Sequence, residues 1–288
     1  MDMLQMKLPG MVTDESLPRI GELRIKVFPA SGVCRIVISK TASTIVGSAR
    51  IVGDAYFTTN DGSANYGKSI DYPTNTIEFS IYAKGNGTPF FIFFGNKYYI
   101  QAFTISTDTP SDWNTSYEGC DFYACDNLKT LRMYRSTQAS LDFESLKTLN
   151  LENLITSSTS GALYGDVSLI ARSTNKIIEV YSGNELKIFG DIEAFKDSSL
   201  ITSLVVFNSD CTGNIEHLGK LTSATRILLF NSNNIEGEVA TLLDNLYSNG
   251  KQTGSITIRI SGTSATYNGL PSSTDIVATF SSSGWTVS

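Results

Sequence analysis

Hydrophobic and polar residues alternate in short runs along the N-terminal part of the chain. The runs are rich in β-branched and aromatic residues, as is typical of β-strands, and include ELRIKVF, CRIVISK and KYYIQAFTI. Residues 76–83 alternate, which predicts a strand with one exposed face, whereas residues 89–94 (PFFIFF) do not alternate and predict burial on both faces. The glycine and asparagine residues at 84–88 and 94–97 predict hairpin turns. Residues 21–107 are therefore expected to form an antiparallel β domain, sandwich or barrel-like.

Two segments beside this domain lack the alternation. Residues 1–20 contain Pro9, Gly10 and Pro18 and predict an extended N-terminal arm, because such a polar segment builds neither a helix nor a core. Residues 108–119, which include STDTPSDWNTS, predict a linker.

The remainder, residues 120–288, repeats one short phrase. Strand-like aliphatic runs recur as LKTLRM, LKTLNL, IIEVYS, SLVVFNS, RILLFNS and SITIRIS, beginning at 128, 146, 177, 203, 226 and 255. Several runs are followed by a glycine, an acidic or amide residue, and aliphatic residues three positions apart. These glycines are Gly165, Gly190, Gly213 and Gly237.

An acidic or amide side chain at that position is typical of a helix start, because it can accept hydrogen bonds from unpaired backbone amides. The longest such helix is expected in EVATLLDNLYSNG, with Gly250 as its C-terminal stop. A unit of strand, tight turn and short helix cannot bury its aliphatic side alone. We therefore expect the units to stack into a parallel-stranded solenoid.

The phrase LLFNSNNIEGEV resembles the Leu-x-Leu-x-x-Asn-x-Leu-x-Gly-x-Ile pattern of leucine-rich-repeat proteins. The matching places are Leu228, Phe230, Asn233, Ile235, Gly237 and Val239. A second copy, LVVFNSDCTGNI, has Ser209 at the asparagine place and Cys211 at a leucine place. The Asn-Ser pair recurs after 23 residues and the glycine after 24. The resemblance implies a leucine-rich-repeat-like parallel β solenoid over about 120–270, in a protein that is mainly β with short helices.

The composition and charge of the chain argue against several classes of protein. Only 17% of residues are charged, the net charge is −6, and no cluster of Lys and Arg appears, which argues against nucleic-acid partners. No apolar run is long enough to span a membrane. The four cysteines are too few for a disulfide scaffold and are expected to be reduced and structural, although Cys120 and Cys125 are close enough to leave pairing open.

The segment GSANYGKS, residues 62–69, formally matches a phosphate-binding loop. That loop requires a preceding buried strand and a following helix, and Pro73 would break such a helix. We interpret the segment as a polar turn with a solvated lysine. His217, the single histidine, is expected on an exposed helix without a nucleophile beside it. The sequence thus predicts no catalytic residue, metal ligand or cofactor; a glycan-active enzyme stays a remote alternative, because distant carboxylates can meet in space.

The remaining candidate is a surface. Residues between the inward aliphatic positions of stacked strands line one continuous face, where repeat proteins bind. We predict this binding face at Arg132, Tyr134, Asn150, Glu152, Glu179, Tyr181 and Phe207. In the runs at 203 and 226 both faces are apolar, so Val205, Phe207 and Leu229, or their neighbours in the other register, are expected to be covered by another segment or another chain.

The N-terminus has no hydrophobic segment typical of a signal peptide, which predicts folding in a cytoplasm. The chain is also similar in style to repeat proteins of gut bacteria and their phages. That resemblance implies a non-catalytic virion component of a tailed phage (a capsid decoration protein, fibre or tail adhesin), assembled in the host cytoplasm. The arm would contact other structural proteins, the repeat face would bind a host-surface protein or glycan, and the chain would form a homo-oligomer. A bacterial cell-surface leucine-rich-repeat adhesin is the alternative.

Overall fold

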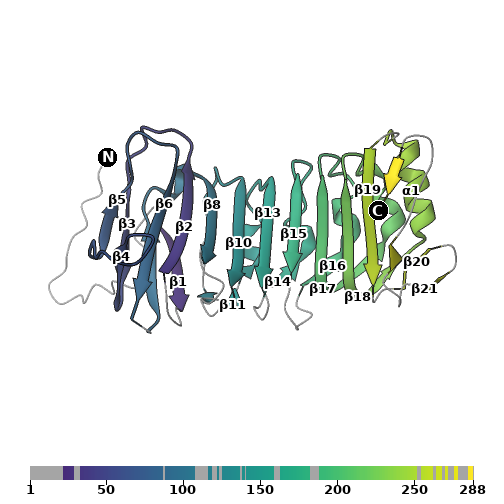
Figure 1. Cartoon of the computed structure of the whole chain (residues 1–288). Helices are drawn as coiled ribbons and strands as arrows, with labels where there is room; N and C mark the ends of the chain where they lie inside the picture. Colours follow the sequence, from purple (N-terminus) through teal and green to yellow (C-terminus); the bar gives the residue numbers. More distant parts are fainter. Residues whose placement is uncertain are drawn as a thin grey trace, which may run out of the picture.

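The computed structural model describes residues 22–287 except 29–32, 87, 108–115, 119–121, 123–124, 137, 140, 159–162, 182–187, 252–253, 262–263, 268–269, 272–275 and 278–284. The predicted arm and Cys120 lie outside the described residues. The described chain is mainly β with few helices, and it forms a small antiparallel sheet plus a large mixed, largely parallel sheet. The molecule is elongated, with β1 (Leu23–Phe28) to β8 (Ile100–Thr107) at one end and α1 (Val239–Ser248) at the other (Figure 1).

The N-terminal part is two packed sheets. Its elements are β1 (Leu23–Phe28), β2 (Val33–Lys40), β3 (Ser48–Val52), β4 (Ala55–Thr58), β5 (Ser69–Asp71), β6 (Glu78–Gly85), β7 (Phe90–Phe94), the 3-10 helix η1 (Lys97–Tyr99) and β8 (Ile100–Thr107). The small sheet has the order β11-β9-β1-β7-β3-β5, in which β9 (Ser116–Glu118) and β11 (Gln138–Ala139) come from later in the chain, while β4, β6, β2 and β8 belong to the large sheet. The ring of Phe94 on β7 packs edge-on against Phe103 on β8, with 5.3 Å between centroids, so the two sheets share one core.

Burial along these strands follows the hydrophobic pattern. Alternate residues of β6 are buried, as its alternating sequence predicts. The prediction that the run at 89–94 is buried on both faces is confirmed for β7, where all residues but the half-buried Phe91 are buried. Phe93 points away from the shared core and is covered by Arg50, whose guanidinium lies 3.8 Å from the ring centroid. Glu22 holds Arg50 in place through an ion pair of 2.8 Å.

The predicted hairpin turns at 84–88 and 94–97 are wrong. β6 pairs with β2 and β4, β7 pairs with β1 and β3, and β8 pairs with β2, so both connections cross from one sheet to the other. The turn residues nonetheless act as expected at Asn96, which has a left-handed backbone with φ of 57°. Glycine and asparagine residues indicate that the chain reverses direction, but they do not indicate which sheet the next strand joins.

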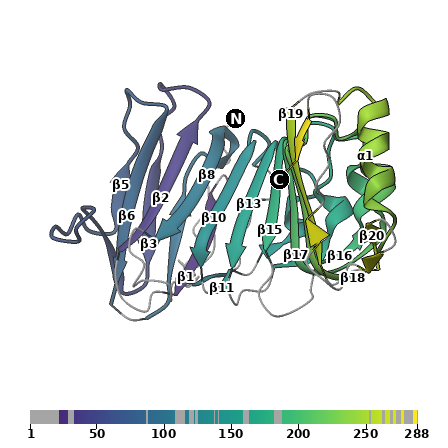
Figure 2. The ribbon, with the colours of Figure 1, turned by 45° about the vertical axis from the view of Figure 1, so that its right-hand side comes forward.

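The C-terminal part is a stack of units that continues the large sheet directly from β8 (Figure 2). Its outer strands are β10 (Thr130–Ser136), β13 (Asn153–Ser158), β15 (Ile177–Tyr181), β17 (Ser203–Asn214), β18 (Arg226–Glu236) and β19 (Gly254–Ser261). These outer strands all pair in parallel with one another. β8 also pairs in parallel with β10, so one strand serves both as the end of the antiparallel domain and as the start of the stack. Within the predicted linker, Ser116–Glu118 forms β9, which pairs with β1.

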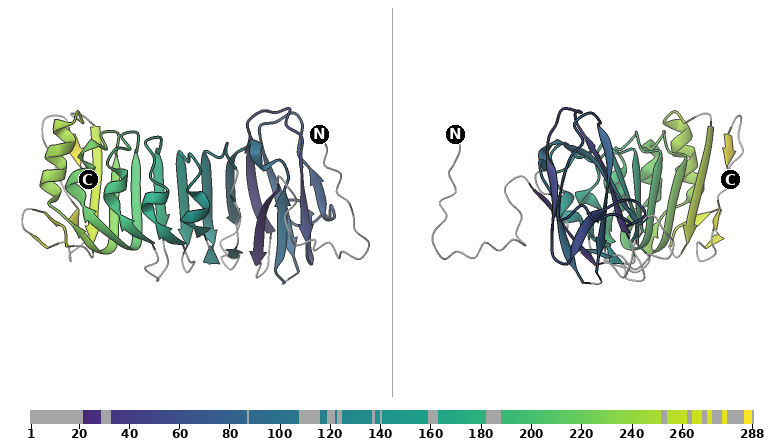
Figure 3. Two further views of the ribbon diagram at one scale, coloured as in Figure 1. Left: turned by 180° about the vertical axis from the view of Figure 1, so that it is seen from behind. Right: turned by 60° about the vertical axis from the view of Figure 1, so that its left-hand side comes forward.

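After each outer strand except β19 the chain continues into a second strand and then a short helix. The second strands are β12 (Leu141–Asp142), β14 (Leu163–Asp166), β16 (Ile188–Asp191) and the C-terminal halves of β17 and β18; β11 (Gln138–Ala139) precedes β12. The helices are η3 (Phe143–Leu146), η4 (Val167–Leu169), η5 (Ile192–Phe195), η6 (Ile215–Lys220) and α1 (Val239–Ser248), which Figure 3 shows from behind. Beyond β19 the described chain adds β20 (Thr266–Tyr267), β21 (Leu270–Pro271), β22 (Ile276–Val277) and β23 (Trp285–Val287).

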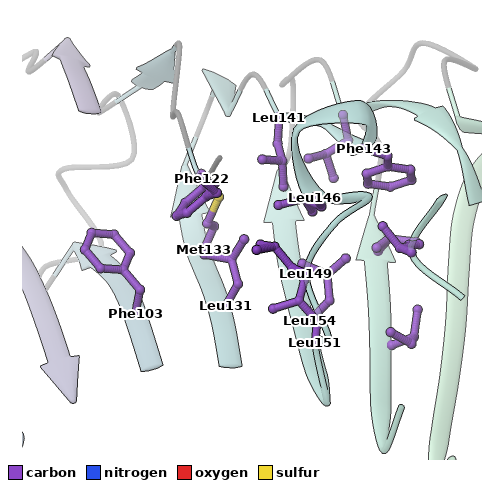
Figure 4. Close-up of a cluster of buried hydrophobic side chains, with 14 of the residues drawn as sticks. Phe103, Phe122, Leu131, Met133, Leu141, Phe143, Leu146, Leu149, Leu151 and Leu154 are labelled. Atoms are coloured by element: carbon purple, nitrogen blue, oxygen red, sulfur yellow. The ribbon is translucent and has the colours of Figure 1, made fainter. Parts of the chain in front are cut away.

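A spine of buried aliphatic residues runs through the stack. The inward residues of the outer strands lie side by side as Phe103, Leu131, Leu154, Ile178, Leu204, Ile227 and Ile258. Their spacing from Leu131 to Ile227 is 23, 24, 26 and 23 residues, which is more regular than the sequence suggested. The run LKTLNL is not a strand: its leucines Leu146, Leu149 and Leu151 lie in η3 and the following turn, and pack beneath β10 and β13 (Figure 4).

The helix starts predicted after the four recurring glycines are formed, and a further one, at Asp142, has no glycine before it. Asp142, Asp166, Asp191 and Asn214 each precede a 3-10 helix and accept a 2.8 Å hydrogen bond from the backbone N–H two residues ahead. The glycines of the phrase give these caps room. Gly213 has φ of +108°, and a Cβ there would lie 2.2 Å from Oδ1 of Asp191 in the preceding unit; Gly190 and Gly237 meet Asp166 and Asn214 in the same way. The repeated glycine is therefore required by contact between units.

The register of β18 differs from the leucine-rich-repeat alignment. Ile227 and Leu229 point inward and are fully buried, while Leu228 and Phe230 point outward, so the last two do not occupy the leucine places. In β17 the inward residues are Leu204 and Val206, in agreement with its alignment. The paired strands shift register between Ser209 and Thr212. Between these pairs β17 has one residue more than β18, so Gly213 lies in register with Ile235 and not with Gly237, the next glycine of the phrase.

Candidate binding face

The outward residues of the parallel strands form one sheet face, called here the outer face. It consists of the alternate residues between the inward spine positions on β10, β13, β15, β17, β18 and β19. Because neighbouring parallel strands lie about 4.8 Å apart, residues in register stand next to one another across the strands. One such row is Arg132, Ile155, Glu179, Val205, Leu228 and Arg259, and the next contains Tyr181, Phe207 and Phe230.

Three aromatic rings stack along the outer face. The centroids of Tyr181 and Phe207 are 5.8 Å apart with 33° between the ring planes, and those of Phe207 and Phe230 are 5.2 Å apart with 48°. The guanidinium of Arg259 lies 5.3 Å from the Phe230 centroid and covers that end of the stack. All three rings are half-buried, because each ring face lies against its neighbour. The aromatic ladder therefore leaves part of each ring exposed on the outer face.

An ion pair crosses the ladder's base. Arg226 on β18 reaches over β17 to Glu179 on β15, with 3.2 Å between Nη1 and Oε1, and Ser203 donates a 2.7 Å hydrogen bond to the same oxygen. Val205 lies in register between Glu179 and Leu228 and is fully buried, so this apolar outward position is covered within the chain.

The same groups alter the titration of the neighbouring tyrosine. Burial raises the pKa of Tyr181 above its usual value, and the carboxylate of Glu179 raises it further. The phenol is therefore neutral near pH 7 and is available as a hydrogen-bond donor at the end of the ladder.

The structure brings Glu179, Tyr181 and Phe207 together, while Arg132 lies in the same row of the outer face as Glu179, two strands away. Arg132 is half-buried on β10, and its buried Nε has no hydrogen-bond partner within the described part of the chain. Tyr134 belongs to β10, but its side chain lies outside what the structure describes.

Asn150 and Glu152 were expected on a strand and instead precede β13, because the run at 146–151 is a turn. Glu152 pairs with Lys176 at 2.6 Å in the next unit. The sequence reasoning missed Arg226, Phe230 and Arg259. Phe230 could have been found from the repeat itself, since Phe-Asn-Ser occurs at both 207–209 and 230–232.

The phosphate-loop match is a polar turn between β4 and β5, as interpreted from the sequence. A strand, β5, follows it instead of a helix, and the exposed Lys68 donates a 2.7 Å hydrogen bond to the carbonyl of Gly53. Asp61 closes the preceding turn by accepting hydrogen bonds from Thr59 and Ser63, which lower its pKa to about 2.

His217 and the cysteines also lie where structural roles are expected. His217 is exposed on η6, with Nδ1 2.7 Å from Oε2 of Glu193. The pKa of Glu193 is lowered by a hydrogen bond from the backbone of Asn214 and by the bond from His217. Cys34, Cys125 and Cys211 are buried, and burial raises the pKa of the Cys211 thiol to about 12.

Neither a metal-binding cluster nor a membrane-spanning helix is present among the described residues. Those residues contain no group of three or more His, Cys, Asp or Glu side chains arranged to hold a metal ion. Among the described helices, none has both the length and the apolar character to cross a membrane. In comparisons with known proteins, no family model, no curated protein and no solved structure matches this chain.

Proposed function

We propose that this chain is a non-catalytic attachment protein, a structural component of a tailed-phage virion, which binds its target through the outer face. The observation that carries the proposal is the ordered ladder of Tyr181, Phe207 and Phe230 with the guanidinium of Arg259 at its end. Tyr, Phe and Arg are the side chains enriched in the centres of protein interfaces, where they supply much of the binding energy.

The ladder is suited to binding because its side chains are held before a ligand arrives. Each ring is fixed by its neighbours, and the ion pair between Arg226 and Glu179 fixes the polar groups beside them. Less conformational entropy is then lost when a partner binds. The outer face also continues from β10 to β19 without an intervening element in the strand order, which favours an extended partner over a small molecule.

We further propose that the stack is a leucine-rich-repeat-like solenoid. The parallel outer strands, the capped helix starts and the recurring glycines support this assignment. The register of β18 is its main departure from that pattern, because Leu228 and Phe230 face outward and Phe230 becomes part of the proposed binding surface.

Binding is tested with the full-length chain carrying a fluorescent label, applied to a panel of intact gut bacterial cells and to arrays of their surface glycans. Phe207→Ala is expected to reduce binding at least about tenfold, as for an interface residue worth more than 1.4 kcal/mol. Phe189→Ala is the matched control, since Phe189 is an exposed phenylalanine on β16 of the same stack and away from the outer face. Equal loss in both variants, or loss in neither, would refute the proposed surface.

The virion assignment has a separate test. Antibodies raised against the purified chain are expected to label intact phage particles in electron micrographs. If the antibodies label bacterial envelopes and do not label phage particles, the alternative is favoured, a bacterial cell-surface adhesin that uses the same face.

A further inference from the structure

The outer face continues beyond the stack onto the sandwich. β8 pairs with β10 on one side and with β2 on the other. Alternate residues of β2 and β8 point into the core, so their remaining side chains lie on the same sheet face as the outward residues of the stack. The strands from β2 to β19 are side by side in one sheet (Figure 1), and at about 4.8 Å per strand this continuous face is about 34 Å across.

Four arginines point outward on this face and are called here the outward arginines. They are Arg35 on β2, Arg132 on β10, Arg226 on β18 and Arg259 on β19. Among the described outward side chains from β2 to β19, the one acidic residue is Glu179. This face is therefore basic, although the chain has a net charge of −6. The arginines are far apart in the sequence, and the strand order brings them onto one surface.

The segments next to this face add no positive charge. They are β6, the turn at 59–63 and the residues that lead into β10, β13 and β15. Acidic side chains in these segments outnumber the basic ones; the charged residues are Asp61, Glu78, Lys84, Asp126, Lys129, Glu152 and Lys176. The excess of positive charge thus lies on the outward arginines in the middle of the face.

Three of the outward arginines have a partner within the chain. Arg35 donates from Nε to the hydroxyl of Ser80 at 3.3 Å. Arg226 and Arg259 have as partners the carboxylate and the aromatic ring described above. These contacts hold the guanidinium groups in defined positions on the sheet, so less conformational entropy is lost when a ligand binds to them.

Arg132 lacks such a partner. It is half-buried, and its Nε is buried without a hydrogen-bond acceptor in the described part of the chain. Its neighbours in register, Thr104 and Ile155, are uncharged. The nearest carboxylate of its row, on Glu179, is two strands and about 10 Å away and is paired with Arg226. A charged donor removed from water without an acceptor is unfavourable, and an anion bound over it would supply the missing acceptor.

We propose that this face binds a linear polysaccharide that bears carboxylate groups, and that Arg132 binds one of those carboxylates. The inference rests on the proposed attachment function and names the chemical class of the target. Arg132 lies between the aromatic ladder and Arg35 in the strand order, so a chain that crosses the strands from the ladder towards β2 passes over it. A guanidinium binds a carboxylate through two parallel N–H groups, which a ligand held over the sheet can reach.

The spacing of the outward arginines favours a polymer with carboxylates at intervals. The strands of Arg35 and Arg132 are about 10 Å apart, and those of Arg132 and Arg226 about 19 Å apart. A nucleic-acid strand, with a phosphate about every 3.4 Å, would place most of its charges over uncharged residues such as Ile155 and Leu228. A peptide strand would find no open backbone groups, because the inner strands already pair on both sides. Sugar hydroxyls need only side-chain partners, which this face provides at Thr104, Asn153 and Thr257.

The test measures binding of the full-length chain to immobilised polygalacturonate, alginate and hyaluronan, and to the same polysaccharides after chemical reduction of their carboxylates to alcohols. At least one native polysaccharide is expected to bind about tenfold or more tightly than its reduced counterpart. Its binding should weaken as the salt concentration rises, because salt screens exposed charges. A thymidine oligonucleotide is the probe for a polyphosphate ligand and is expected to bind more weakly than that polysaccharide.

Two variants of Arg132 and a matched control complete the test. Arg132→Gln is expected to weaken binding to the native polysaccharide about tenfold and to leave binding to the reduced one unchanged, whereas Arg132→Lys, which keeps the charge, should lose less. Arg24→Gln is the control: Arg24 is half-buried on β1 of the other sheet, its Nε also has no described acceptor, and its guanidinium lies 5.7 Å from the Phe91 centroid. It is expected to bind like wild type. Circular dichroism and thermal unfolding check that each variant is folded.

The proposal is overturned if no native polysaccharide binds better than its reduced form, if Arg132→Gln binds like wild type, if Arg24→Gln loses as much, or if the oligonucleotide binds more tightly. Cell binding by Phe207→Ala is scored separately. Loss of cell binding in that variant, together with polysaccharide binding that does not depend on carboxylates, would refute this inference and leave the attachment function standing. Unchanged cell binding in Phe207→Ala, with carboxylate-dependent binding through Arg132, would refute the ladder as the attachment surface and leave the polysaccharide contact.

Discussion

Replacing Gly213 with alanine tests whether the units are joined through the helix caps. Gly213 has φ of +108°, and an added Cβ would lie 2.2 Å from Oδ1 of Asp191. That oxygen accepts the 2.8 Å hydrogen bond from the backbone of Glu193 and so caps η5 in the preceding unit. Alanine at position 213 therefore changes its own backbone energy and also forces the Asp191 carboxylate out of its capping position.

The two effects have separate magnitudes. A non-glycine residue at this φ costs about 1–2 kcal/mol. Loss of the helix cap costs about a further 1 kcal/mol. We expect the free energy of unfolding to fall by about 2–3 kcal/mol in Gly213→Ala.

Gly250 provides a matched control, because it has the same φ of +108° and no atom within 4 Å of where its Cβ would be. Gly250→Ala should lose only the backbone contribution, about 1–2 kcal/mol. In the background of Asp191→Ala, where the cap is already absent, Gly213→Ala should cost no more than Gly250→Ala. The double-mutant cycle should thus show a coupling of about 1 kcal/mol between positions 191 and 213.

The measurement is equilibrium unfolding in urea, followed by circular dichroism, with all variants compared at one pH and temperature. Equal costs for Gly213→Ala and Gly250→Ala, together with strict additivity of the Asp191 and Gly213 substitutions, would refute the reasoning. The glycine would then be required by its backbone alone, and the contact between units would carry no stability.

Two further predictions concern buried and paired charges. Lys40→Met should lower the free energy of unfolding by about 3–5 kcal/mol, because it leaves three buried carbonyls without donors, whereas Lys68→Met at the exposed turn should change it by less than about 0.5 kcal/mol; urea unfolding distinguishes the two, and similar values would contradict the role of the Lys40 ammonium. The pKa of Glu193 is lowered in the folded protein, so its contribution to stability is present above the unfolded pKa of about 4.3 and is lost as pH falls through the folded value. Glu193→Gln should therefore show a smaller drop in urea midpoint between pH 6 and pH 3.5 than wild type, and an equal drop would exclude this carboxylate as a source of the pH dependence.

Local signals in the sequence predicted local structure well. The acidic and amide residues after each glycine cap helices as expected, and α1 ends just before Gly250. The strands of the sandwich and their buried faces also follow the hydrophobic pattern, since burial of alternate side chains is a property of the strand itself.

Packing and pairing between segments that are far apart in the chain could not be predicted from the sequence in the same way. The two copies of LKTL differ in structure, because one enters β10 and the other packs its leucines in a turn under the sheet; identical letters do not fix which backbone conformation buries them. The turn residues at 84–88 and 94–97 gave no information on which sheet follows. The ion pair between Glu179 and Arg226 joins residues 47 positions apart, and the strand order β15-β17-β18, which brings them together, could not be predicted from the sequence.

The join at β8 has a consequence for the size of the molecule. Because β8 pairs with β2 on one side and with β10 on the other, the sandwich end and the α1 end are separated only by the intervening units of the stack. Each unit contains about two dozen residues and adds one strand spacing, about 4.8 Å, to the long axis. Duplication or deletion of a single unit would then lengthen or shorten the molecule in fixed steps while leaving both ends intact. The distance between the two ends is therefore set by the number of units.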